Sequence, residues 1–157
     1  VARKAGVKLV IVGDVTRHLP WSEEYFLKEV EPHIDGSRIR HIKQLPYGEL
    51  LELMARARGL IFPLQWDEPF GMVVVEAMAA GAPVLAYRRG SMPELIRDGE
   101  TGFLLDSEEA MVEAVLKIGT LERWCCRDWV EKHFSVECMV EGYEALYRKV
   151  AGEAIRR

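Results

Sequence analysis

Cysteine is scarce in this sequence. The three cysteines, Cys125, Cys126 and Cys138, form no CxxC motif and no pair spaced with histidines for zinc. A low and odd number of cysteines outside such motifs is typical of reduced thiols rather than of disulfides or a zinc site. We therefore expect the cysteines to be buried or chemically inert.

Long apolar runs are also lacking. The most apolar stretch, residues 72–87, is interrupted by Glu76, Gly81 and Pro83, whereas a membrane-spanning helix needs about 20 predominantly apolar residues. Residues 1–12 contain three basic residues and no small-residue cleavage pattern, so they do not resemble a secretory signal. These absences predict a cytoplasmic protein without a membrane span.

Charge of one sign is not concentrated in any part of the chain. The 157 residues include 21 Lys and Arg against 25 Asp and Glu, a net charge of −4, and 49% of the residues are hydrophobic. This composition is typical of one soluble globular domain and excludes a disordered or collagen-like chain. Without a cluster of basic residues, nucleic acid is not an expected partner.

Several familiar catalytic motifs are absent as well. Residues 10–14 end a predicted strand in glycine, but the sequence does not continue as GxGxxG, which disfavours a nicotinamide site. The sequence contains no HExxH and no GxSxG motif, and its four histidines are scattered. We interpret the histidines as surface or internally hydrogen-bonded side chains.

The sequence does contain a regular alternation of short apolar runs with longer segments of helical period. This pattern is typical of βα units that feed a parallel sheet, so the predicted fold class is α/β. The predicted strands are residues 7–12, 38–42, 60–63, 83–87 and 102–105. The predicted helices between them are residues 22–30, 47–58, 71–80 and 107–118, the last with Asp106 and Glu109 as a capping box.

The two ends of the chain depart from this alternation. Residues 120–157 contain no further strand and predict a tail of two helices that divide near Ser135. Residues 1–6 look like the end of a helix that runs into the first strand. An open nucleotide-binding sheet usually has about six strands. Since only five are predicted, we expect that one βα unit is missing upstream.

The loop after the third predicted strand is the richest in chemistry. In an open parallel sheet, ligands bind beyond the carboxyl ends of the strands, and this loop runs through Gly71 into a helix. The N–H groups of Met72 and Val73 would begin that helix and suit an anion such as phosphate. An ordinary loop-to-helix turn explains the same glycine, so both interpretations stay open.

Three carboxylates lie in or beside this segment. Glu76 belongs to a helix that is apolar on nearly all sides, so we expect it to be buried and to bond either a protein donor or ligand hydroxyls such as those of ribose. Asp67 and Glu68 precede the helix, where they either compensate its dipole or contact a sugar hydroxyl and stabilise an oxocarbenium-like centre. These residues alone are compatible with either role.

Residues 68–84, EPFGMVVVEAMAAGAPV, strongly resemble the EPFG-x-x-x-x-EAMA-x-G-x-PV signature of retaining family 4 glycosyltransferases. The two glutamates have the E-x7-E spacing of that family. The resemblance covers the chain from Lys8 to the tail, and its further segments are residues 7–13, 42–45, 49–57, 90–96 and 98–105.

The resemblance implies a GT-B enzyme, in which two Rossmann-like domains flank a cleft. The chain is similar to the C-terminal, donor-binding half: a Rossmann-like parallel sheet with helices on both faces and a helical C-terminal tail. Residues 1–157 would form a single nucleotide-sugar-binding domain, with residues 120–157 as its tail. The N-terminal acceptor domain would lie outside this chain.

Carried over position by position, the resemblance implies roles for eight residues. Glu68 would be the catalytic residue, which contacts the donor sugar near the reacting carbon in a positioning and electrostatic role. Glu76 would bond the ribose hydroxyls, and the loop at Gln44 and Leu45 would frame the base through main-chain contacts. The donor sugar and the diphosphate would be bound by the backbone N–H groups of Phe70, Gly71, Met72 and Val73.

The sequence departs from the family in one segment. The first βα unit of the family's donor domain carries a GR...KG segment whose Arg and Lys neutralise the diphosphate, and no residues here match it. The chain alone is therefore expected to bind the donor weakly and to be inactive. The family works without an essential bound metal, and we expect no cofactor.

The implied reaction is transfer of a hexosyl unit from a nucleotide-diphosphate sugar to an acceptor hydroxyl with retention of configuration. UDP-glucose is the favoured donor, because residues 66–70 and 88–91 are similar to bacterial members that use it, while GDP-mannose stays open. The missing N-terminal domain would bind most of the acceptor, and peripheral membrane association of the parent enzyme is compatible with this assignment.

Two other functional classes stay open. A nucleotide-sugar-sensing or binding module without catalysis would bind a nucleotide and would tolerate the loss of Glu68. A flavodoxin-like interaction domain would bind no nucleotide sugar, and it is disfavoured because it leaves Glu76 without its ligand.

Overall fold

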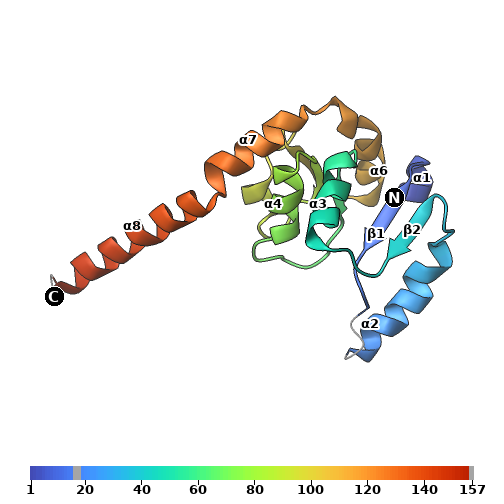
Figure 1. Ribbon diagram of the computed structural model, residues 1–157, viewed down its shortest axis with the longest axis horizontal. Helices are drawn as coiled ribbons and strands as arrows, with labels where there is room; N and C mark the ends of the chain where they lie inside the picture. Colours follow the sequence, from blue (N-terminus) through green and yellow to red (C-terminus); the bar gives the residue numbers. More distant parts are fainter. Residues whose placement is uncertain (16–18, 156–157) are drawn as a thin grey trace.

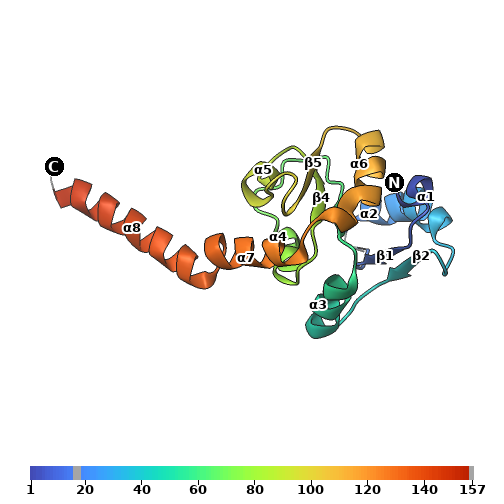
Figure 2. The same cartoon turned by 90° about the horizontal axis from the view of Figure 1, so that it is seen from above.

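The computed structural model describes residues 1–15 and 19–155. Helices and strands alternate along the chain, which confirms the α/β class (Figures 1 and 2). The first half contains α1 (Ala2–Ala5), β1 (Leu9–Val12), α2 (Pro20–Tyr25), η1 (Phe26–Val30), η2 (Glu31–His33), β2 (Ile39–Ile42), α3 (Tyr47–Arg56) and β3 (Leu60–Phe62). The second half contains α4 (Met72–Ala79), β4 (Val84–Tyr87), α5 (Met92–Leu95), β5 (Gly102–Leu105), α6 (Glu108–Lys117), η3 (Ile118–Thr120), α7 (Arg123–His133) and α8 (Val136–Ile155).

The strands are parallel and lie in two sheets. β1 pairs with β2, with Leu9 opposite Ile39, and the other sheet has the order β3-β4-β5, with Val84 between Leu60 and Gly102. All five predicted strands are confirmed. The last has its predicted bounds, and the other four are slightly shorter than predicted because their ends already belong to loops.

One edge of β1 and one edge of β3 pair with no other strand in the described residues. Figures 1 and 2 place β1 on the side of its sheet that is nearer to the three-stranded sheet. The apolar residues of β1 and β3 are only half-buried, whereas Val84, Leu85 and Ala86 of β4 are fully buried. Continuous apolar runs are typical of strands in a sheet that is covered on both faces. β1 and β3 therefore have the composition of interior strands, although each has an unpaired edge in the described part of the chain.

Helix α4 is the centre of the larger hydrophobic core. Val74, Ala77 and Met78 are completely buried, and the helix packs against α7, α3, β3 and β4. This helix contains a single charged residue, Glu76, which explains why it is covered on several sides. Its packing fixes the position of the loop that leads into it.

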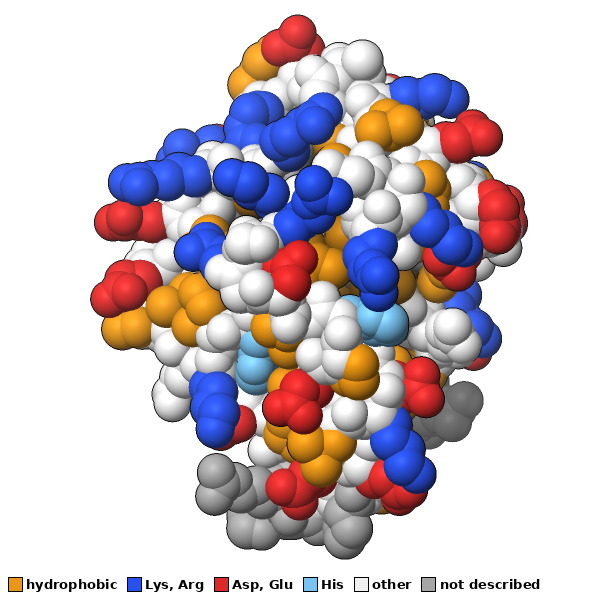
Figure 3. Space-filling model, turned by 90° about the vertical axis from the view of Figure 1, so that its right-hand side faces the viewer, with side chains coloured by type: hydrophobic (Ala, Val, Ile, Leu, Met, Phe, Trp, Pro, Cys, Tyr) orange, Lys and Arg blue, Asp and Glu red, His pale blue; other side chains and the backbone are white. Residues whose placement is uncertain are grey.

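Helix α6 forms a second cluster against β4. Met111, Ala114 and Val115 pack with Leu85. Helix α1 lies against α6 and confirms the helix end predicted for residues 1–6. Figure 3 shows the side of the molecule that carries α1 and β2, where hydrophobic side chains lie exposed between charged ones.

The two C-terminal helices confirm the predicted tail and its division near Ser135. Helix α7 packs on α4 and buries Cys126 and Val130. Helix α8 extends away from the rest of the molecule (Figures 1 and 2). Its exposed apolar side chains follow the three- and four-residue spacing of one helix face: Val136, Met139, Val140, Tyr143, Leu146, Tyr147 and Val150. Within residues 1–15 and 19–155, no helix has the length and apolarity needed to cross a membrane.

Three local features differ from what the sequence predicts. The helix expected over residues 22–30 starts at Pro20, and its second half, η1, is a π-helix. The N-cap of α6 is Ser107, whose Oγ accepts a hydrogen bond from the Ala110 N–H at 3.1 Å, and not Asp106. The short helix α5 was not predicted, because four residues are too few to show a helical period.

Candidate active site

The loop between β3 and α4 opens at the carboxyl end of the sheet. Gly71 has a φ of +93°, a backbone conformation that favours glycine. Its carbonyl oxygen accepts from the Val74 N–H at 2.9 Å. The N–H groups of Met72 and Val73 therefore have no partner inside the helix. Together with the helix dipole, they form an end that suits an anion.

Glu76 and Tyr47 join α4 to α3. The Tyr47 hydroxyl donates a hydrogen bond to Glu76 Oε1 at 3.2 Å, and this bond raises the pKa of Tyr47. Gln44 and Leu45 lie in the loop that leads into Tyr47. The three residues predicted to contact the nucleoside therefore lie on α4 and in the loop before α3, and this hydrogen bond joins α4 to the start of α3.

Glu76 is only half-buried, in contrast to the burial predicted from its apolar neighbours. Met72 is 63% exposed and Ala79 is also exposed. Both lie on the same face of α4 as Glu76, four and three positions away. The apolar residues of this face therefore border solvent rather than the core. The carboxylate of Glu76 accepts a hydrogen bond from a protein donor, the Tyr47 hydroxyl.

Glu68 lies half-buried near the end of the same loop. Its Oε2 accepts a hydrogen bond from Nε1 of Trp66 at 3.3 Å. Its carbonyl oxygen accepts from the Ser91 N–H at 3.0 Å. Gly90, with a φ of +54°, lies against the Glu68 backbone. The loop between β4 and α5 therefore holds the backbone of Glu68, while Trp66 orients its carboxylate.

Ser91 is a residue of this site that sequence reasoning did not single out. It is 8% exposed, and its Oγ donates to the carbonyl oxygen of Phe70 at 2.6 Å. The Phe70 ring makes an edge contact with Phe134, with ring centroids 6.4 Å apart. Ser91 thus fixes the backbone immediately before Gly71. Its sequence signals are its place in a loop after a strand and its inclusion in the segments of the resemblance, residues 88–91 and 90–96.

Asp67 forms an ion pair with Arg89, with Oδ1 and Nε 3.1 Å apart, and makes no capping bond to α4. Arg89 also donates to the carbonyl oxygen of Gln65. These contacts tie the loop to the end of β4. In the part of the chain that the structure describes, no group of three or more His, Cys, Asp or Glu side chains is placed to hold a metal ion.

Comparison with protein families now identifies the chain. The family model "Glycosyl transferases group 1" matches residues 1–132. The chain belongs to this family. The matched region of this group 1 glycosyltransferase contains the loop before α3, the loop before α4 and α4 itself, and thus all eight residues for which the sequence predicts a role.

Relatives of this group 1 chain are considerably longer. A D-inositol 3-phosphate glycosyltransferase of Corynebacterium efficiens is 35% identical over 103 residues, which are 66% of this chain and 24% of that protein. The solved sucrose-phosphate synthase of Thermosynechococcus elongatus is 24% identical, with a TM-score of 0.80 over 97% of this chain and 41% of that one. Anabaena HepE, solved in complex with UDP and glucose, is 25% identical, with a TM-score of 0.71 over 92% of this chain and 42% of that one.

The chain therefore spans less than half the length of these relatives. The similarity in fold confirms the α/β, Rossmann-like architecture expected for one half of a GT-B glycosyltransferase.

Proposed function

We propose that this chain is the donor-binding domain of a retaining glycosyltransferase that uses a nucleotide-diphosphate sugar. The observation that supports this most is the Tyr47–Glu76 hydrogen bond. It joins α4, which carries Glu76, to the start of α3, just after Gln44 and Leu45, and these residues lie inside the region matched by the family model.

Glu76 is suited to hold the ribose. A carboxylate has two oxygens and about four acceptor positions, and one hydrogen bond, from Tyr47, is present. Because Glu76 is half-exposed, the remaining positions can accept from the two ribose hydroxyls. Gln44 and Leu45 frame the base through their main chain, on the same side of α4.

The start of α4 binds the donor sugar and the diphosphate. The backbone N–H groups that serve this role belong to Phe70, Gly71, Met72 and Val73. The hydrogen bond from Ser91 to the Phe70 carbonyl oxygen and the positive φ of Gly71 fix the backbone of this segment, in which the side chains of Phe70 and Met72 are exposed. Backbone donors in a fixed arrangement stabilise negative charge without reorganisation.

Glu68 is the catalytic residue. In the transfer, the bond between the anomeric carbon and the diphosphate oxygen breaks, and its electron pair leaves with the nucleoside diphosphate. The acceptor hydroxyl oxygen bonds to the same face of that carbon, and its proton passes to the departing diphosphate. The sugar develops oxocarbenium-like positive charge, which the carboxylate of Glu68 stabilises. Trp66, Gly90 and Ser91 hold Glu68 in position.

UDP-glucose is the proposed donor, and a hexosyl unit is transferred. Similarity in fold to HepE, solved with UDP and glucose, supports this choice. We propose no metal or cofactor, a cytoplasmic location, and an acceptor that is bound mainly by another domain of the parent protein.

The open edges of β1 and β3 support one further βα unit in the parent domain. A parallel strand inserted between them gives the order β2-β1-new-β3-β4-β5, which is the strand order of a dinucleotide-binding sheet. This unit would cover the half-buried apolar residues of both strands. Because the resemblance puts the diphosphate-neutralising Arg and Lys on it, the chain alone is expected to be inactive.

Ligand-observed NMR on the 157-residue chain tests donor binding. UDP, UDP-glucose, GDP-mannose, ADP-glucose and NAD are compared at millimolar concentration. We expect saturation transfer to the ribose and base protons of the uridine nucleotides, lost in Glu76→Ala and kept in Glu113→Ala, an exposed glutamate on α6. Selective binding of NAD, or no loss in Glu76→Ala, would contradict the proposal.

A second variant separates catalysis from sensing. In the parent enzyme, Glu68→Gln should abolish sugar transfer while UDP binding is retained. Transfer at the unaltered rate would favour a nucleotide-sugar-binding module without catalysis.

A further inference from the structure

A cavity of about 500 Å³ lies at the carboxyl edge of the three-stranded sheet. Its lining comes from the ends of β3, β4 and β5 and the loops after them: Gln65, Tyr87, Arg88, Arg89, Leu105, Asp106 and Ser107. This is the edge at which parallel sheets bind ligands. The volume lies within the range of about 300–1,000 Å³ that is usual for small-molecule sites.

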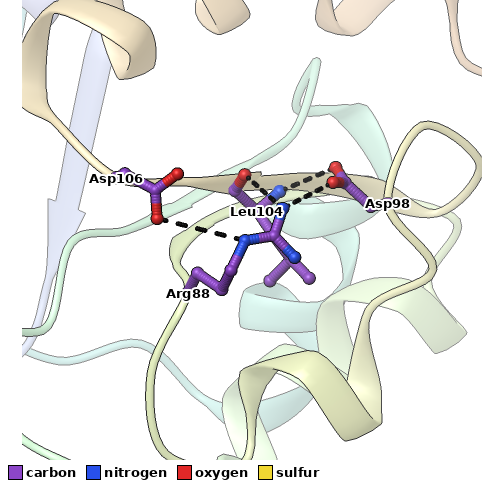
Figure 4. A network of polar contacts seen from close by, with 4 residues as sticks. All are labelled: Arg88, Asp98, Leu104 and Asp106. Atoms are coloured by element: carbon purple, nitrogen blue, oxygen red, sulfur yellow. Dashed lines mark hydrogen bonds and ion pairs between the residues drawn. The ribbon is translucent and has the colours of Figure 1, made fainter.

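The guanidinium group of Arg88 is held in place on one side of this cavity. It donates to Asp98 Oδ2 at 2.8 Å and to the Leu104 carbonyl oxygen at 3.2 Å, and its Nε lies 4.0 Å from Asp106 Oδ1. Figure 4 shows the Arg88 side chain between these two aspartates at the end of β5. A group fixed in this way needs little further ordering when a ligand binds.

Arg89 is held in a similar way on the other side. It pairs with Asp67 at 3.1 Å and donates to the Gln65 carbonyl oxygen. The two guanidinium groups are thus matched by three carboxylates, those of Asp67, Asp98 and Asp106. The cavity therefore has no surplus of positive charge. Phosphate is typically recognised by a guanidinium group that is free to donate two parallel hydrogen bonds, whereas both arginines here are paired with carboxylates.

This balance of donors and acceptors suits hydroxyl groups. A hydroxyl both donates and accepts, so a polyhydroxyl ligand can donate to Asp106 and accept from Arg88 or Arg89. The amide of Gln65 and the hydroxyl of Ser107 also offer both donors and acceptors. The lining therefore favours an uncharged sugar over an anion.

The cavity adjoins the loop that carries Glu68 and shares no lining residue with the Tyr47–Glu76 pair. Arg89 pairs with Asp67, which precedes Glu68, and Gly90 lies against the Glu68 backbone. The Tyr47–Glu76 hydrogen bond joins α3 to α4, and neither residue lines the cavity, which reaches the end of β5. Glu68 lies on the loop that runs from β3 into α4, and this loop both contributes Gln65 to the cavity and leads to the helix that carries Glu76.

We propose that this cavity is an acceptor subsite that binds an uncharged sugar unit next to the accepting hydroxyl. The inference rests on the proposed function, since it takes Glu68 as the place of the donor sugar. The acceptor is then a saccharide or polyol that is not phosphorylated at the unit in the cavity.

Saturation-transfer NMR on the 157-residue chain tests the subsite, with maltose as a neutral probe and glucose 6-phosphate as an anionic one. We expect transfer to maltose that is unchanged in Glu76→Ala and in the presence of excess UDP-glucose. The double variant Gln65→Ala/Asp106→Asn should reduce it at least fivefold. Glu113→Gln on α6 is the matched control, and the amide spectrum of each variant verifies its fold.

Four results would overturn the subsite: no transfer to maltose, equal transfer in the double variant, displacement of maltose by UDP-glucose, or stronger transfer to glucose 6-phosphate. Displacement would assign the cavity to the donor sugar. Failure of the proposed function has a different signature, the lack of a Glu76-dependent UDP signal, and the two failures are therefore distinguishable.

Discussion

Gly90 and Glu68 meet through their backbones. A Cβ on Gly90 would lie 2.6 Å from the Glu68 nitrogen and 2.7 Å from its carbonyl oxygen. This contact joins the loop after β4 to the residue that we place at the reacting carbon. The geometry of Glu68 therefore depends on a residue 22 positions later in the chain that contributes no side chain.

The variant Gly90→Ala should lower the free energy of unfolding by at least about 2 kcal/mol. An alanine at φ +54° is strained, which costs about 1–3 kcal/mol, and the added methyl group meets backbone atoms that cannot rotate away. Urea denaturation measures the change. Gly99→Ala is the control, because Gly99 has a φ of +79° but no atom near its Cβ position. An equal decrease in the free energy of unfolding in the two variants would show that the contact between Gly90 and Glu68 does not contribute to stability.

Removal of the Tyr47 hydroxyl should weaken nucleotide binding. In Tyr47→Phe, Glu76 loses the hydrogen bond that orients it. A bond of this kind contributes about 0.5–1.5 kcal/mol, which corresponds to roughly a two- to thirteenfold change in Kd. Isothermal titration calorimetry with UDP measures it. Tyr143→Phe on α8 should bind as the unaltered chain does. An unchanged Kd in Tyr47→Phe would remove Tyr47 from the site.

Asp35 should make stability depend on pH in the acid range. Its Oδ1 accepts hydrogen bonds from the N–H groups of Ile39, Ser37 and Arg38 at 2.7–2.9 Å, and these lower its pKa from 3.8 to about 2. A lowered pKa stabilises the folded state above the unfolded pKa, and this contribution is lost as the pH falls from about 4 to about 2.

In Asp35→Asn the neutral amide oxygen can still accept these bonds, but it does not titrate. Thermal unfolding followed by circular dichroism between pH 5 and pH 2 should therefore show a shallower fall of Tm in the variant than in the unaltered chain. Parallel curves would contradict the assignment.

Cys126 should resist alkylation in the folded protein. It is completely buried, and burial raises the pKa of its thiol to about 11. Because the thiolate is the reactive form, iodoacetamide at pH 8 should modify the half-exposed Cys125 and Cys138 first, as read by mass spectrometry. In guanidinium chloride the three should react alike. Native modification of Cys126 at the rate of Cys138 would be inconsistent with this burial.

The apolar face of α8 should promote self-association at high concentration. Tyr143, Leu146 and Tyr147 are each more than half exposed on one face of a helix that extends from the molecule. Leu146→Glu should shift sedimentation velocity profiles toward the monomer, and Glu137→Lys, outside the apolar face, should not. A monomeric unaltered chain at millimolar concentration would contradict this prediction.

Most of the fold could be predicted from local pattern. The apolar runs that form β3, β4 and β5 are short and bounded by turn residues, so their type and place follow from the sequence. The pairing of the strands could not be predicted, because a parallel strand carries no local signal that identifies its neighbour. Helix α5 also could not be predicted, because it forms where Ser91 and Trp129 make tertiary hydrogen bonds that the local sequence does not reveal.

The site could be predicted in part. Glu68, Glu76 and the glycine between them form a recognisable motif, and the structure puts them at the expected edge of the sheet. Tyr47 and Ser91 were not found, since each acts across more than 20 residues of chain, a relation that spacing does not reveal. The burial of Glu76 was overestimated because composition does not distinguish an apolar face that borders a site from one that borders the core.

The division into two sheets also has a consequence for local stability. Within the described part of residues 7–45, Ile39 is the one buried apolar side chain, whereas both hydrophobic clusters are built on β4 and its helices. Amides of β1 and β2 should therefore exchange with solvent through a partial opening of low free energy, well before those of β4. Tyr47 and Glu76 bridge the end of the weaker unit and the stable one, so a nucleotide held at this corner would couple the two units into one cooperative body.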